Sequence, residues 1–263
     1  MTSTVTGPGP TRSVPAAGHM PVRWQLPLLL QWQARRMASA LPLLVLVQIL
    51  LSVATVIGYG LLVGQPAPGE ALFLATGAPT VSLVMVGLVM TPQLVVQSRA
   101  EGSADWMRTL PVRRELFLAA DLLVWTLIAL PGVVLGVLAG VLRFHVHLAP
   151  TLWLVPTAFV VSLTAAAVGY AIAWLLPGTI AQLLSQVLVF VVLLFSPVSF
   201  PADRMPLWLQ HAHEWLPIEP MAQAVRAGLA PASFSMPGRS VAVLGAWCVL
   251  CVAGAAWALR RRA

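Results

Sequence analysis

Six long apolar stretches divide this sequence, and they limit what the chain can fold into. They cover residues 40–63, 71–96, 116–142, 148–176, 178–200 and 241–259. A helix of about 20 apolar residues crosses a hydrocarbon core of about 30 Å, so each stretch can span a bilayer. Strands of a membrane barrel would alternate polar and apolar residues, and these stretches do not. Only 9% of the 263 residues are charged, against about 25% in a soluble domain. The sequence therefore predicts an all-α integral membrane protein with six transmembrane helices.

The basic residues orient these helices. All 15 of them are arginine. With the amino end in the cytoplasm, 11 arginines flank cytoplasmic segments, and four lie outside: Arg143, Arg204, Arg226 and Arg239. Because cytoplasmic loops of membrane proteins are enriched in basic residues, we expect both termini in the cytoplasm. The predicted location is the cell (plasma) membrane, as a multi-pass protein of a bacterial inner membrane.

The segments outside the apolar stretches predict the domain organisation. Residues 1–22 are rich in Thr, Ser, Pro and Gly and are expected to be a disordered cytoplasmic tail. Residues 23–263 are expected to form one transmembrane domain. Residues 24–37 mix Trp, Leu, Gln and Arg, which favours a segment at the membrane interface.

The missing residue types exclude several activities. The chain has no lysine, so it lacks a phosphate-binding GxxxxGK loop and a Schiff-base lysine. Cys248 and Cys251 lie within an apolar stretch and are interpreted as core residues rather than a metal or redox pair. We therefore expect no enzyme activity of its own, no metal site, no nucleic-acid partner and no cofactor bound by this chain.

Asp121 is the one Asp, Glu, Arg or His side chain that falls within the predicted spans. It lies five residues into the third span, and Arg113 or Arg114 is its expected partner. Ion-coupled carriers use carboxylates or histidines at membrane depth, and an intramembrane enzyme would need a nucleophile–base pair, metal ligands or paired acids. The predicted spans offer no carboxylate or histidine apart from Asp121. The sequence therefore disfavours two alternatives, an ion-coupled secondary carrier and an intramembrane enzyme.

The loop 97–115 contains a predicted short helix. Ser103 can cap this helix and Asp105 suits its first turn, while Pro111 ends it. On the helix, Trp106, Met107 and Leu110 share one face. An exposed aromatic and aliphatic face favours docking on a partner, and the alternative is a helix lying on lipid headgroups.

Two spans carry polar residues at helical spacing. The first span holds Gln48, Ser52, Thr55 and Tyr59, and the fifth holds Gln182, Ser185 and Gln186. Hydrogen bonding between helices and a substrate path would both explain these residues, and the sequence leaves the two open.

Two segments resemble a known family. One runs from Glu101-Gly102-Ser103 to Leu110-Pro111-Val112-Arg113-Arg114, and the other contains Phe195-Ser196-Pro197, Leu207-Trp208-Leu209, Pro217 and Ala224-Val225-Arg226. Together they are similar to the cytoplasmic loop and the outer segment of permease subunits of type-2 ABC exporters. With six spans and cytoplasmic termini, the resemblance covers the chain from Trp24 onward.

The resemblance implies a half-transporter. A second permease subunit, identical or homologous, would complete it, and two copies of a cytoplasmic ABC ATPase subunit would bind ATP and Mg. The ATPase-coupling residues it implies are Glu101, Gly102, Ser103, Asp105, Trp106, Met107, Arg108, Leu110 and Pro111. Residues 24–37 would be an elbow helix, and the segment before the last span a pair of short extracellular helices. Spans one, two and five would line the substrate path and the dimer interface, and the expected cargo is an amphipathic drug, natural product or lipid-like molecule.

Overall fold

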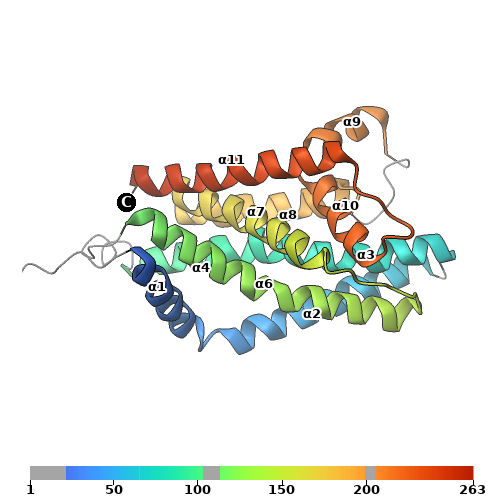
Figure 1. Ribbon diagram of the computed structural model, residues 1–263, viewed down its shortest axis with the longest axis horizontal. Helices are drawn as coiled ribbons and strands as arrows, with labels where there is room; N and C mark the ends of the chain where they lie inside the picture. Colours follow the sequence, from blue (N-terminus) through green and yellow to red (C-terminus); the bar gives the residue numbers. More distant parts are fainter. Residues whose placement is uncertain (1–21, 65, 103–112, 199–204, 263) are drawn as a thin grey trace, which may run out of the picture.

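The computed structural model describes residues 22–64, 66–102, 113–198 and 205–262, and most residues in these ranges lie in helices and none in a strand. Figure 1 shows long helices running side by side, with α1 set at a steep angle across one end of the bundle. The predicted disordered tail lies outside the described residues except for its last residue, which begins α1.

Six helices are long and apolar enough to cross a membrane, as the sequence predicts. They are α2 (Leu41–Val63), the continuous run of α3 (Pro68–Met85), η1 (Val86–Met90) and α4 (Thr91–Ala100), then α6 (Arg114–Phe144), α7 (Leu154–Leu175), α8 (Gly178–Phe195) and α11 (Gly238–Arg262). The remaining described helices are α1 (Val22–Met37), α9 (Leu207–Trp215) and α10 (Ile218–Leu229).

The helices differ in how deeply they are packed. We compared the most apolar 18 consecutive residues of each span. The fraction of these residues that is buried is 78% in the second span, to which α3 belongs, 61% in α7 and 50% in α6. Those values fall to 22% for α2 and 17% for both α8 and α11. Three central helices thus form the core of the chain, and the other three present most of their apolar surface to the surroundings.

The centre of the bundle contains a π-helix where the second span meets α7. Gly87 of η1 packs so closely on α7 that a Cβ there would lie 2.4 Å from Ala165. Gly169 of α7 is equally close to η1, because a Cβ on Gly169 would lie 2.1 Å from the Gly87 carbonyl oxygen. In the π-helix the Val86 carbonyl accepts the backbone N–H of Thr91, five residues on, and also a 3.2 Å hydrogen bond from the Thr91 hydroxyl.

The two ends of the bundle differ in charge and structure. The arginine-rich end holds α1, the end of α4, the start of α6 and the end of α11, with Arg36, Arg99 and Arg260 among its side chains. There Arg260 donates a 2.6 Å hydrogen bond to Glu115, which ties α11 to α6. The opposite end holds the two short helices α9 and α10 between α8 and α11.

The fourth span begins later than the apolar stretch that predicts it. The stretch starts at residue 148, but α7 starts at Leu154. The amides of Ala149 and Thr151 instead donate to carbonyls at the end of α10, at 3.0 and 2.9 Å. Pro150 lies between them and cannot donate a helical hydrogen bond, so this segment packs along α10.

Candidate functional site

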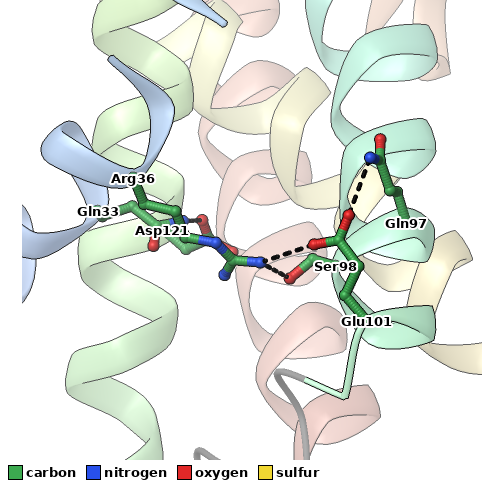
Figure 2. Close-up of polar contacts among 6 residues, drawn as sticks. All are labelled: Gln33, Arg36, Gln97, Ser98, Glu101 and Asp121. Carbon is green, nitrogen blue, oxygen red and sulfur yellow. Dashed lines mark hydrogen bonds and ion pairs between the residues drawn. The ribbon is translucent and has the colours of Figure 1, made fainter. Parts of the chain in front are cut away.

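A polar network joins α1, α4 and α6 at the arginine-rich end. Figure 2 shows Arg36 of α1 reaching across to α4, where it donates a 2.7 Å hydrogen bond to the Ser98 hydroxyl and lies 3.7 Å from the Glu101 carboxylate. Gln97 also donates to Glu101, at 3.0 Å. These contacts hold the end of the second span against the first helix of the chain.

Glu101 and Gly102 form the turn that ends α4. The Glu101 amide donates to Gln97 at 3.0 Å, and the Gly102 amide donates to Arg99 at 3.1 Å. Gly102 has a φ of +80°, a conformation that glycine adopts without strain. The other predicted coupling residues, Ser103, Asp105, Trp106, Met107, Arg108, Leu110 and Pro111, lie outside the described residues. The described chain resumes at Arg113, immediately before α6.

The buried carboxylate of Asp121 has a different partner from the predicted one. Gln33 of α1 donates a hydrogen bond to it through Nε2, and Asp121 is only 6% exposed. Arg113 and Arg114, the partners expected from the sequence, are exposed at the start of α6. Asp121 lies seven residues after Arg114, about 10 Å further along the helix at 1.5 Å per residue. Because α1 packs across α6 at that level, its glutamine reaches the carboxylate.

A pocket of about 300 Å³ adjoins this network between α1, α4, α6 and α7. Polar side chains and aromatic rings share its lining, including Gln33, Asp121, Trp125, Tyr170 and Trp174. Arg99 lies beside it, with its guanidinium 4.9 Å from the centre of the Trp174 ring and a hydrogen bond to the Ala173 carbonyl.

The polar residues of the first span divide between the chain interior and its edge. Gln48 is fully buried and donates a 2.6 Å hydrogen bond to the Ile128 carbonyl of α6. Ser52 is also fully buried, and its hydroxyl lies 2.8 Å from that of Ser82 on α3. Thr55 bonds within its own helix, at 2.7 Å to the Leu51 carbonyl, and Tyr59 is partly exposed. In this conformation the first two side chains make hydrogen bonds between helices.

Two of the three polar residues of the fifth span face outward. Gln182 and Gln186 are exposed on α8, among large apolar side chains such as Leu183 and Phe190 that are 63% and 56% exposed. Ser185 is buried and donates to the Ala181 carbonyl at 2.8 Å. The outer surface of α8 therefore combines two amides with a broad apolar face.

Sequence reasoning missed a buried cation at the opposite end. Arg226 of α10 is 4% exposed, and its guanidinium donates to the Pro197 and Val198 carbonyls after α8. It also lies 3.6 Å from the ring centre of Phe73. Burial lowers the pKa of Arg226 to about 10. The sequence placed Arg226 outside the membrane and within the family motif Ala224-Val225-Arg226, but neither use predicted that its side chain is buried.

The described ranges contain no group of three or more His, Cys, Asp or Glu side chains that could hold a metal ion. His213 is buried, and its ring nitrogen Nε2 lies 2.7 Å from the Phe195 carbonyl oxygen.

Comparison with known proteins addresses the whole region from α1 to α10. The family model described as ABC-2 type transporter matches residues 25–230. No curated protein matches the chain.

Proposed function

This chain belongs to the family of ABC-2 type transporters, and we propose that it works as the permease subunit of an ATP-driven exporter. It is a multi-pass membrane protein with the permease domain of an ABC-type transporter. The proposed cargo is an amphipathic drug, natural product or lipid-like molecule that is moved out of the cytoplasm. The family match over residues 25–230 is the observation that carries the proposal.

The energy would come from separate ABC ATPase subunits, two per complex, that bind ATP and Mg. Because the chain contains no lysine, it cannot form a GxxxxGK phosphate-binding loop. We place the arginine-rich end in the cytoplasm, where the excess of arginine favours it. Both Gly102 and Arg113 lie at that end, and the segment between them is the proposed contact with the ATPase subunits.

The proposed coupling runs from this segment into the membrane through Glu101. Trp106, Met107 and Leu110 would insert into the ATPase surface, with Arg108 at the edge. Glu101 follows directly on α4 and contacts Arg36 of α1 at 3.7 Å. A displacement of the segment would therefore act on both the second span and the elbow helix α1.

The exposed face of α8 is the proposed border of the substrate path and of the second permease subunit. Its two amides, Gln182 and Gln186, are four residues apart and so share one face. Amides facing hydrocarbon lack hydrogen-bond partners, which disfavours a lipid-facing position for them. A second permease, identical or homologous, would supply those partners or enclose an aqueous path with them.

Only some of the polar residues of the first span can line this path in the described conformation. Thr55 and Tyr59 are partly exposed and can contribute in the described conformation. Gln48 and Ser52 would join the path only if α2 separates from α3 and α6 during the cycle. Hydrogen bonds between membrane helices contribute only about 0.6 kcal/mol on average. Breaking those of Gln48 and Ser52 would therefore require little free energy from an ATP-driven motion.

Reconstitution tests the energy source. Vesicles holding the chain and a co-expressed ABC ATPase should accumulate a fluorescent amphipathic dye, rhodamine 123, when ATP is supplied to the ATPase side. Vesicles with a hydrolysis-deficient ATPase variant are the matched control and should not accumulate it. Accumulation by the chain alone under a proton gradient would overturn the proposal and favour an ion-coupled carrier.

Cysteine accessibility tests the path. In a variant with Cys248→Ser and Cys251→Ser, cysteines at Gln182 and Gln186 should react with a polar thiol reagent in at least one nucleotide state. A cysteine at Val249, which is 69% exposed on α11, provides the lipid-facing comparison. If α8 positions stay as unreactive as Val249 in every nucleotide state, α8 does not border the path.

A further inference from the structure

The pocket at the arginine-rich end has an unsatisfied floor. Asp121 accepts a hydrogen bond from Gln33, but within the described part of the chain no basic side chain lies within ion-pair distance of it. Gln33 itself is 5% exposed, and its Oε1 is buried with no donor among the residues that the structure describes. Arg36, one turn further along α1, is engaged with α4 instead. Among the described residues the floor therefore carries one buried acceptor without a donor, Gln33 Oε1, next to the Asp121 carboxylate, and leaving such a group unpaired costs stability.

Aromatic rings form part of the pocket lining, together with the side chains of Arg36 and Arg99. Trp125 and Tyr170 are each 1% exposed and Trp174 is 2% exposed, and Phe117 adds a further ring to the lining. Aromatic faces attract cations, most strongly where water is excluded. One ring already shows this preference, because the Arg99 guanidinium lies 4.9 Å from the centre of the Trp174 ring.

A donor is also left over on the wall. The Trp125 indole Nε1 is buried with no hydrogen-bond partner among the described residues. It lies four residues after Asp121 on α6, so both project from the same face of that helix. A ligand in this pocket would thus meet acceptors at Asp121 and Gln33 and a donor one turn away at Trp125.

We propose that this pocket binds the ammonium group of an amphipathic amine. The N–H groups would donate to Asp121 and Gln33 Oε1, the aromatic rings would surround the attached carbons, and an oxygen near the amine would accept from Trp125. A volume of about 300 Å³ is at the lower end of the range of ligand pockets, which suits the polar end of such a molecule. The amine belongs either to the cargo or to an ethanolamine phospholipid, which share this chemistry. The inference rests on the proposed function only in naming a cargo class.

Binding to the purified chain, without ATPase or ATP, provides the test. The probe is dansylcadaverine, a fluorescent primary amine, and its matched control is N-hexyldansylamide, in which a methyl group replaces the primary amine at the end of the chain. Wild-type protein in phosphatidylcholine nanodiscs should bind the amine at least tenfold more tightly than the control probe. That factor corresponds to one charge-assisted hydrogen bond. Equal affinities for the two probes would overturn the proposal.

Substitutions locate the binding. Asp121→Asn keeps the size and an acceptor but removes the charge, and it should abolish the preference for the amine while leaving binding of the control probe unchanged. Asp121→Glu should keep the preference, which separates loss of charge from loss of folding. Glu214→Gln, an equivalent change at the opposite end of the molecule, should have no effect. A full amine preference in the Asp121→Asn protein would show that the amine binds elsewhere.

Lipid composition distinguishes the two sources of the amine. If the ligand is a lipid headgroup, adding phosphatidylethanolamine to the nanodiscs should weaken dansylcadaverine binding to the wild type and not to the Asp121→Asn protein. Unchanged binding in both would assign the pocket to cargo. Because no ATPase takes part, failure of ATP-driven transport would leave this result intact, and failure of amine binding would not affect the proposed energy source.

Discussion

Replacing Arg226 tests whether a buried cation holds α10 to the end of α8. The guanidinium donates two 3.2 Å hydrogen bonds to the Pro197 carbonyl and one of 2.7 Å to the Val198 carbonyl. It also contacts the Phe73 ring of α3 at 3.6 Å from its centre. Three elements therefore depend on one side chain that is 4% exposed.

The magnitude follows from what Arg226→Met removes. Two buried carbonyls lose their donor, which costs about 2 kcal/mol each, and a desolvated cation–π contact worth about 2 kcal/mol is lost. One gain offsets these losses. Burial lowers the pKa of Arg226 from 12.5 to about 10, so the guanidinium remains charged at pH 7 while its dehydration costs the folded state about 3 kcal/mol. The net expectation is a loss of about 3 kcal/mol of unfolding free energy.

Denaturant unfolding of the purified chain in detergent, followed by tryptophan fluorescence, measures this loss. Arg226→Lys should lose less than Arg226→Met, because it keeps the charge but not the planar fork of donors. Arg239→Met is the matched control, since Arg239 is half-exposed and its 2.8 Å ion pair with Glu214 should be worth under about 1 kcal/mol. If Arg226→Met and wild-type protein unfold at the same midpoint and slope, the guanidinium does not fasten α10 to α8, and the reasoning fails.

Three other substitutions give distinct expectations. Trp106→Ala should weaken ATPase binding in a pull-down roughly thirtyfold, while Arg108→Ala changes it little; equal effects would contradict the proposed coupling face. Gly169→Ala places a Cβ 2.1 Å from a carbonyl oxygen of η1 and should cost about 3 kcal/mol, whereas Gly245→Ala, which meets open space, should not lower the unfolding midpoint. Burial raises the pKa of Glu219, so this carboxyl contributes stability below about pH 4.5 that is lost as the pH rises through its folded pKa. Glu219→Gln should therefore raise the melting temperature at pH 8 and not at pH 4, and a rise confined to pH 4 would reverse that assignment.

The sequence by itself determined the fold class and the family. Span number follows from the length of apolar stretches, because a bilayer of fixed thickness accepts no shorter helix. The two short helices before the last span were implied by the family resemblance, and the structure has them at Leu207–Trp215 and Ile218–Leu229, each preceded by a proline. These features depend on residues close together in the chain, which is why hydropathy and family motifs predict them. The predicted start of the fourth span was wrong, because it depends on contacts with a distant part of the chain. Residues 148–153 bond to the end of α10 instead of forming the first turns of α7.

Only the tertiary structure decided what each polar side chain does. A stripe such as Gln48 and Ser52 has the same spacing whether it faces a path or a neighbouring helix, and the packing of α2 on α6 and α3 selects the neighbour. Gln182 and Gln186 have similar spacing but remain exposed, because α8 packs at the edge of the bundle. Asp121 pairs with a residue 88 positions away, since α1 crosses α6 at that level. Periodicity fixes which residues share a helix face, but the partner of that face depends on how distant helices pack, and no local pattern encodes it.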